Sequence, residues 1–240
     1  MHTRFSTRGH QRVAYDVVGP ATAPAVVLLH DLLGQRSSLS AVRDRLGDFI
    51  RCVSIDLRGH GASATISGAS IDLGELALDV AAVLAQEELA SAIFIGHGLG
   101  GAVARRLASE LPSFVTAIVA IQSPEVGLAG EPLVESDRRA ADLAYKGLAD
   151  AALVAYLTPR LGSTWRDDLP RPTVAAHRRH APALATLLPA LAQADPAHTD
   201  AETGVTVVEI DSALGRLDLP PESADAITEA VERFLPSTER

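Results

Sequence analysis

The sequence is poor in several residue types, and each shortage excludes a class of protein. Cys52 is the single cysteine among 240 residues, which excludes internal disulfides and CxxC metal sites. It lies in the apolar run 50–55, so we expect a buried thiol that packs rather than reacts. No stretch approaches the roughly 20 apolar residues of a membrane-spanning helix. Residues 1–5 lead directly into strand-like sequence, so we expect no signal peptide and a cytoplasmic location.

Positive charge is also scarce. Lys146 is the single lysine, and the net charge at pH 7 is −9. Nucleic acids and anionic membranes are bound by basic surfaces, so we expect neither of them as a partner. The hydrophobic content of 47% and the charged content of 21% are those of an ordinary globular protein. A length of 240 residues suits one domain, or one domain with a lid.

Strand and helix signals alternate over the first 120 residues, which is the pattern of a parallel α/β sheet. The predicted strands are residues 12–18, 25–29, 50–55, 92–95 and 115–121. The predicted helices run from a cap at Ser37 or Ser38 to about Leu46, and from a cap at Asp72 to about Glu88. A further helix follows the glycine-rich turn at residues 96–101.

The pattern changes after Pro124. Residues 132–180 are predicted to be helical, residues 205–210 form the clearest late strand, and Ser223 is a candidate cap for a last helix. Four residues are expected to break the helical region: Pro159, Gly162, Pro170 and Pro172. This arrangement predicts a core domain of residues 1–124 and 195–240, interrupted by a helical lid of residues 125–194.

The turn at residues 96–101 reads Gly-His-Gly-Leu-Gly-Gly and lies between a predicted strand and a predicted helix. This is the setting of the G-x-S-x-G nucleophile elbow, whose central serine carries the attacking hydroxyl. Gly98 stands at that central position and has no side chain. Glycine adopts the strained backbone angles of such a turn at little cost, so we expect the turn without its nucleophile. The motif is not a dinucleotide loop, because that fingerprint follows the first strand of its unit.

Two further motifs follow earlier strands: His-Asp-Leu-Leu-Gly at residues 30–34 and Asp-Leu-Arg-Gly-His-Gly-Ala-Ser at residues 56–63. In this order and spacing, the three segments resemble the α/β-hydrolase superfamily, particularly its lidded branch of epoxide hydrolases, haloperoxidases, carbon–carbon hydrolases and small esterases. The resemblance covers nearly the whole chain. It implies an α/β fold with a mostly parallel sheet, flanking helices and a small helical lid. Nothing in the motifs indicates a cofactor or a metal site.

The same resemblance implies a degenerate catalytic triad. The family places its histidine after the last strand, just before the final helix, where this chain has Ala213 or, with a shift of one residue, Leu214. The family's acid follows the preceding strand, and the best remnant of that strand is the alanine-rich segment 189–196. The acid position therefore falls on Asp195 or, in the alternative placement before the lid, on Glu125. Nucleophile and base are therefore both expected to be missing, with Gly98 at the nucleophile position.

The family's oxyanion hole uses backbone N–H groups, which do not depend on side-chain identity. The resemblance assigns these donors to Leu99 and Leu32. Asp31 replaces the glycine that usually follows the family's histidine at position 30. Its carboxylate would either repel a developing oxyanion or point away into solvent, and the sequence leaves both open.

Several histidines accompany these motifs. We expect His30 to hold its loop by hydrogen bonds rather than to act in catalysis, and His60 to belong to its turn together with Arg58. His97 is expected to support the elbow. The run 171–180 is basic and includes His177 and His180. A solvated helix face is the favoured interpretation of this run, ahead of a carboxylate-binding patch, and the two histidines make a poor metal site.

The predicted lid holds Tyr145, Tyr156 and Trp165, which would either line an apolar pocket over Gly98 or pack inside the lid. The leading functional hypothesis is a non-hydrolytic pseudoenzyme that binds a small, largely apolar molecule between core and lid, with a protein partner also compatible. One alternative is an enzyme with non-serine chemistry, such as a lyase, isomerase or cyclase. Another is an unusual hydrolase of small esters that recruits His30, Ser123 or Glu125.

Overall fold

A single seven-stranded sheet organises the computed structural model, which describes residues 2–63, 71–121, 131–193, 204–210 and 221–235. The strands are β1 (Arg4–Arg8), β2 (Gln11–Val18), β3 (Ala25–Leu29), β4 (Arg51–Ile55), β5 (Ala92–His97), β6 (Val115–Ile121) and β7 (Thr206–Ile210). Their order in the sheet is β1-β2-β4-β3-β5-β6-β7. β1 and β2 pair antiparallel, as do β2 and β4, whereas all pairs from β4 to β7 are parallel.

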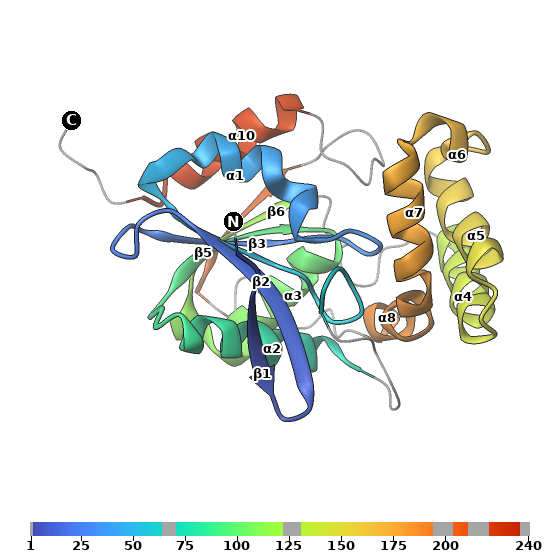
Figure 1. Ribbon diagram of the computed structural model, residues 1–240, viewed down its shortest axis with the longest axis horizontal. Helices are drawn as coiled ribbons and strands as arrows, with labels where there is room; N and C mark the ends of the chain where they lie inside the picture. The colour runs from blue at the N-terminus through green and yellow to red at the C-terminus, as the bar shows by residue number, and fades with distance from the viewer. Residues whose placement is uncertain (1, 64–70, 122–130, 194–203, 211–220, 236–240) are drawn as a thin grey trace.

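Helices cover both faces of this sheet (Figure 1). One face carries α2 (Leu73–Gln86) and α3 (Leu99–Glu110), and the other carries α1 (Ser40–Leu46) and α10 (Pro221–Glu232). Side chains of β5 alternate between the two cores, with Phe94 packing on the α2 and α3 side and Ile95 on the α1 and α10 side. A central strand buried on both faces explains why its sequence is a continuous apolar run.

A group of helices lies between β6 and β7 in the sequence, and we call residues 131–193 the helical insertion. It contains α4 (Glu131–Tyr145), α5 (Ala149–Leu161), α6 (Trp165–Asp168), α7 (Arg171–His180), the short turn η4 (Ala181–Ala183) and α8 (Leu184–Ala192). These helices lie together beyond one end of the sheet, on the right in Figure 1. The predicted lid boundaries at residues 125 and 194 fall outside the described residues and stay predictions. Among the helices described, none is long and apolar enough to cross a membrane.

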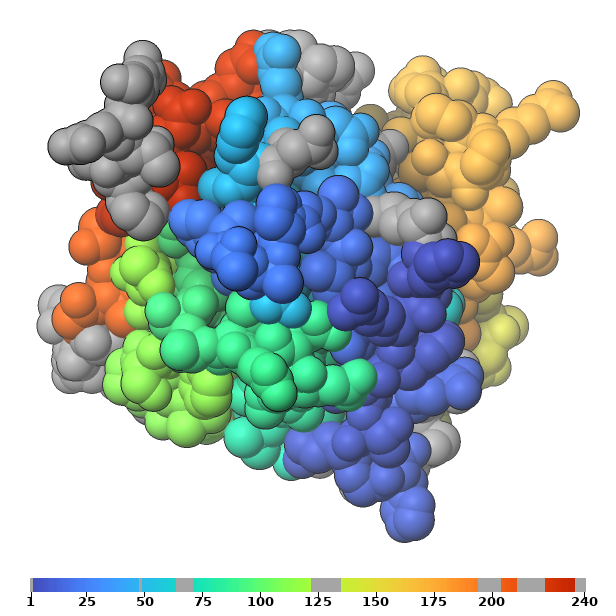
Figure 2. All heavy atoms as spheres, turned by 60° about the vertical axis from the view of Figure 1, so that its left-hand side comes forward, coloured from blue at the N-terminus to red at the C-terminus, as the bar shows by residue number. Residues whose placement is uncertain are grey.

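The antiparallel edge of the sheet is tied to α2 by charge. Arg8 of β1 binds Glu75 and, at 2.9 Å, Asp79, both on α2. Figure 2 shows the β1–β2 hairpin and α2 side by side on the surface at this edge. The site described below lies elsewhere, where the parallel strands end.

Most predicted strands are confirmed, two of them with the predicted bounds, residues 25–29 and 115–121. The predicted cap of the long helix is also confirmed, since Asp72 Oδ1 accepts the backbone N–H of Glu75 at 2.8 Å. That helix ends at Gln86, two residues before the predicted end.

Three local predictions are wrong. The helix expected from Ser37 or Ser38 begins at Ser40 instead, after the 3₁₀ turn η1 (Arg36–Leu39). Ser38 Oγ accepts the N–H of Gln35 at 3.1 Å and holds this tighter turn. Pro159 does not break the helical region, since α5 continues through it to Leu161. The chain breaks earlier, at Gly147, whose φ of 74° ends α4.

The third correction concerns residues 189–196, which we interpreted as the remnant of a strand. The segment up to Ala192 belongs to α8 instead. Leu184, Leu187 and Leu188 are buried at helical spacing, and packing of this face overrides the weak strand signal. In the described sheet, β7 pairs directly with β6.

Candidate functional site

The site is built around the turn between β5 and α3. Gly98 adopts φ 50° and ψ −113°, a left-handed conformation that favours glycine. Its N–H donates to the carbonyl of Ile121 on β6 at 3.0 Å, and its carbonyl accepts from Ala102 in α3 at 3.2 Å. At Gly100, a Cβ would overlap the backbone of Leu29, so α3 packs against β3 at backbone contact. The strand, turn and helix predicted for residues 92–101 are therefore present.

The carboxylate of Asp31 reaches into this turn from the loop after β3. Asp31 Oδ1 accepts the backbone N–H of Leu99 at 2.8 Å. A Cβ added at Gly98 would lie 2.7 Å from Asp31 Oδ2 and closer still to Oδ1. The carboxylate thus occupies the space that a side chain at position 98 would enter.

This placement decides the question that the sequence left open for Asp31, because the carboxylate does not point away into solvent. It also corrects the expectation that Leu99 offers a free oxyanion donor, since that N–H is already bound. The reason is electrostatic: the first N–H groups of a helix lack partners, and the positive end of its dipole favours an anion. Gly98 has no side chain to cap α3, and Asp31 caps it from another loop.

Both ring nitrogens of His30 form hydrogen bonds with backbone groups. Its Nε2 accepts the N–H of Leu57 at 2.9 Å, and its Nδ1 donates to the carbonyl of Asp31 at 2.7 Å. The side chain is fully buried, and burial lowers its pKa. These contacts join the loops after β3 and β4, and they leave no ring nitrogen to exchange a proton with a ligand.

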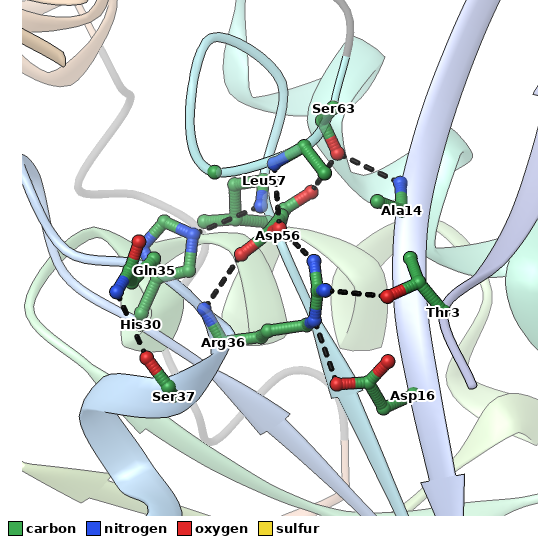
Figure 3. A network of polar contacts seen from close by, with 12 residues as sticks. Thr3, Ala14, Asp16, His30, Gln35, Arg36, Ser37, Asp56, Leu57 and Ser63 are labelled. Atoms are coloured by element: carbon green, nitrogen blue, oxygen red, sulfur yellow. Dashed lines mark hydrogen bonds and ion pairs between the residues drawn. The ribbon is translucent and has the colours of Figure 1, made fainter. Parts of the chain in front are cut away.

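Asp56 organises the polar contacts beneath these loops (Figure 3). Its carboxylate accepts the N–H groups of Arg36 at 2.7 Å and Ala62 at 2.8 Å, and it also binds the Arg36 guanidinium. Arg36 Nε in turn binds Asp16 at 2.7 Å. Ser63 Oγ donates to the Asp56 carbonyl at 2.6 Å and accepts from Ala14 of β2 at 2.8 Å. This network fixes the loop after β4 against its neighbours.

The other polar side chains of residues 56–63 are also engaged. Arg58 forms two hydrogen bonds to Asp79 of α2, at 2.8 and 2.7 Å, and both side chains are buried. His60 Nε2 accepts the N–H of Leu33 at 3.2 Å, and its Nδ1 donates to the Arg58 carbonyl at 3.2 Å. Burial is the main reason that the pKa of His60 is well below its usual value. As expected, His60 and Arg58 belong to the turn.

The interpretation of residues 171–180 as a solvated helix face is confirmed for Arg171, Arg178 and Arg179, which are exposed, and is wrong for the two histidines. His177 and His180 are both buried, and their Nδ1 atoms lie 3.1 and 2.8 Å from the carbonyl oxygen of Leu33. His180 Nε2 also accepts the N–H of Gly61 at 3.0 Å. The spacing i, i+3 places both rings on one face of α7, and this spacing was the available sequence signal for a buried pair.

The three aromatic residues assigned to the lid have different environments. Tyr156 and Trp165 are buried, with exposed fractions of 4% and 2%. Tyr145 is 84% exposed, so it neither lines a pocket nor packs, because it lies at the end of α4 facing away from its neighbours. Burial, followed by the nearby charge of Asp31, raises the pKa of Tyr156. Tyr156 and Trp165 are therefore enclosed by apolar packing, and Tyr145 is not.

The remaining predicted site residues divide into two groups. Leu32 and His97 are buried, beside Asp31 and at the end of β5 respectively. Five candidates lie outside the described residues: Ser123, Glu125, Asp195, Ala213 and Leu214. Within the part of the chain that is described, no group of histidine, cysteine and carboxylate side chains is arranged to hold a metal ion.

Comparison with known families decides what this architecture is. The model of the alpha/beta hydrolase family matches residues 26–237. The chain belongs to the alpha/beta hydrolase family. A curated relative, the sn-1-specific diacylglycerol lipase of Mus musculus, is 33% identical over 45% of this chain and 36% of its own length. The magnesium-chelatase 30 kDa subunit of Rhodobacter capsulatus is 30% identical over 61% of this chain and 49% of its own. The chain thus spans less than half of these relatives.

Solved structures of other alpha/beta hydrolases share the whole fold. An enol-lactonase from Burkholderia xenovorans has a TM-score of 0.73 at 21% identity, covering 96% of this chain and 99% of its own. A hydrolase from Pseudomonas aeruginosa has a TM-score of 0.71 at 22% identity, covering 97% of both chains. At this identity the likeness establishes the fold, a mostly parallel sheet flanked by helices.

Proposed function

We propose that this alpha/beta hydrolase is a non-hydrolytic member of its family, which binds a small, largely apolar molecule between its core and its helical insertion. The observation that carries the proposal is the Asp31 carboxylate, bound to Leu99 N–H in the space over Gly98. One curated relative is named as a subunit of a larger enzyme rather than as a hydrolase, which agrees with a role as a sensor or partner-binding module.

Electrostatics argues against ester hydrolysis at this site. Acyl transfer needs a nucleophile and donors that stabilise the oxyanion of the tetrahedral intermediate. Gly98 supplies no nucleophile, and the Leu99 donor already serves a carboxylate. A second negative charge beside Asp31 would be repelled, so the arrangement disfavours the intermediate as well as the attack.

The Asp31 carboxylate also favours one alternative, an enzyme with non-serine chemistry. A carboxylate held at a helix N-terminus near a buried phenol, here Tyr156, is a candidate general base for proton abstraction in a lyase or isomerase. Recruitment of His30 for hydrolysis has less support, because both of its ring nitrogens bind backbone groups.

Activity measurements on four proteins test the proposal: the wild type, Gly98→Ser, Asp31→Gly, and the double variant. The double variant removes the blocking carboxylate and restores the serine. We expect no labelling by a fluorophosphonate probe and no turnover of short esters above background in any of them, because the family's histidine position falls on Ala213 or Leu214, neither of which can accept a proton. Wild-type labelling or turnover would refute the non-hydrolytic assignment. Rescue in the double variant alone would mean that a base is present and that only nucleophile and donor are lost.

Ligand binding is tested separately. We expect a panel of small apolar molecules to contain compounds that raise the melting temperature and change the emission of Trp165, the single tryptophan, which is buried in the insertion. Turnover of a compound that loses a proton next to a carbonyl, abolished by Asp31→Asn, would favour the lyase or isomerase alternative instead.

A further inference from the structure

Histidines join the helical insertion to the core. The ring of His180 on α7 bonds two core loops at once, donating from Nδ1 to Leu33 after β3 and accepting at Nε2 from Gly61 after β4. These distances are 2.8 and 3.0 Å. The Nδ1 atom of His177 lies 3.1 Å from the same Leu33 oxygen. One imidazole thus links three segments that are far apart in the sequence.

His180 is the outermost member of a row of three buried imidazoles. The ring centroids of His30 and His60 are 4.9 Å apart, and those of His60 and His180 are 5.1 Å apart. In each ring, Nε2 accepts a backbone N–H, from Leu57, Leu33 and Gly61 respectively. A nitrogen that accepts a hydrogen bond carries no proton, so the geometry requires three neutral rings protonated at Nδ1.

The charges around this row act in both directions. The carboxylates of Asp56 and Asp31 favour the charged form of His30, and Asp56 also favours that of His180. Arg179 opposes protonation of His180, and the other two imidazoles oppose protonation of His60. Burial is the largest influence on each ring, and it lowers the pKa of all three.

Protonation of His180 is incompatible with the docked position of α7. A proton on Nε2 would face the N–H of Gly61, and this would turn the hydrogen bond into repulsion between two donors. The positive charge would also lie beside His60 in a buried setting. Release of α7 would carry the ring into water, whereas His30 and His60 are held on core loops.

We propose that the helical insertion is an acid-released cover: protonation of His180 detaches α7 from the loops after β3 and β4 while the sheet stays folded. The insertion moves as a packed group, since α5 and α7 are in contact. Leu33, which both α7 histidines contact, lies two residues from Asp31 in the loop after β3, so release uncovers the loop whose carboxylate lies over Gly98. The proposal concerns access to the elbow and holds whether or not the site is catalytic.

Hydrogen exchange measured by mass spectrometry tests the proposal on the intact chain. Exchange is measured between about pH 8 and about pH 5 and corrected for intrinsic exchange. Below the ordinary histidine pKa of about 6.5, protection of the α7 amides should fall by roughly tenfold for each pH unit. β5 should stay protected over the same range, and the change should reverse on neutralisation. Unchanged protection of α7, or simultaneous loss in β5, would overturn the proposal.

A pair of variants assigns the effect to one ring. His180→Gln removes the titrating group, so α7 should exchange faster at neutral pH and lose its response to acid. His10→Gln is the matched control, because His10 is exposed in the turn after β1, and it should respond as the wild type does. An acid response that persists in the His180 variant would contradict the assignment.

Nitrogen NMR of the wild type gives a measurement that does not depend on the variant folding. We expect His180 to show the neutral form protonated at Nδ1 near neutral pH, and to become protonated at the pH at which α7 opens. A protonated His180 in a protein whose α7 is still protected from exchange would refute the proposal that this protonation releases α7.

Discussion

The turns that follow β4 and β5 belong to the same end of the sheet, yet they use their residues in opposite ways. In residues 56–63, the side chains of Asp56, Arg58, His60 and Ser63 all hold neighbouring segments. In residues 96–101, backbone hydrogen bonds hold the turn at Gly98, and Asp31 on another loop supplies a charged contact to Leu99 N–H. Polar side chains therefore fix the first turn, whereas backbone hydrogen bonds and the Asp31 carboxylate hold the second.

The comparison separates what keeps the fold from what would perform a reaction. The polar side chains of the first turn support the alpha/beta hydrolase fold. At the elbow, the backbone geometry is kept, while the space for a reactive side chain is occupied by a carboxylate that caps α3. The stabilising side-chain contacts and the space where a reactive side chain would stand therefore lie in different turns, so each can be altered by mutation without changing the other.

The largest expected effect is on the first turn. Asp56→Ala would leave the Arg36 guanidinium and two backbone N–H groups without their buried partner, so we expect a loss of about 3–5 kcal/mol in unfolding free energy. Urea denaturation followed by circular dichroism measures it. The control is Asp44→Ala, whose exposed carboxylate pairs with its neighbour Arg43. A loss for Asp56→Ala no greater than that of the control would contradict the structural role of this turn.

At the elbow, Gly98→Ser should be destabilising by about 1–3 kcal/mol, from backbone strain together with the clash with Asp31. Gly147→Ser is a matched control, since its φ is also positive but a Cβ there meets nothing within 4 Å. The difference between the losses in unfolding free energy of the two variants measures the contribution of the clash with Asp31.

A double-mutant cycle with Asp31→Gly extends this test. Removing the carboxylate should recover the part of the loss that comes from the clash and leave the part that comes from strain. Strict additivity of the two substitutions would show that the carboxylate does not occupy the space over Gly98.

Acid should weaken the contacts of three buried histidines, of which His60 belongs to the first turn. The pKa values of His30, His60 and His180 are lowered by burial, so the folded state binds fewer protons than the unfolded chain. Stability is therefore complete above the unfolded pKa of about 6.5 and falls as the pH drops below it, by up to about 1.4 kcal/mol per pH unit for each such ring. Urea midpoints measured across this range check the slope. Stability that rises on acidification would contradict neutral buried rings.

The smallest effect concerns the cap of α3. Asp31→Ala should cost about 0.5–2 kcal/mol, because Leu99 N–H loses its acceptor. Asp72→Ala is the comparison, since Asp72 caps α2 from its own N-cap position. Similar losses in thermal denaturation would show that a carboxylate from a distant loop caps as well as a local one. A stabilised Asp31→Ala protein would mean that the carboxylate is strained.

Sequence reasoning recovered the local structure of this chain better than its long-range contacts. The strands at residues 25–29 and 115–121 follow from apolar runs, and the cap at Asp72 follows from its position before a helical pattern. In the helical region, the predicted breaks at Gly162 and Pro170 are confirmed, whereas Pro159 lies inside α5 and the end of α4 at Gly147 was not predicted. The prediction of a strand near residue 189 is wrong, because the leucines before it are buried at helical spacing and stabilise α8.

The sequence by itself determined the family resemblance, the alternation of strands and helices over the first 120 residues, and the lack of a side chain at Gly98, since these depend on residue type and local pattern. Only the tertiary structure decided where Asp31 and His180 act. Their partners, Leu99 and Gly61, lie 68 and 119 residues away along the chain, and packing of the sheet and helices brings them together. Local pattern carries no information about such distant contacts. The sequence therefore shows that position 98 has no side chain, but it does not show that the Asp31 carboxylate occupies the space there.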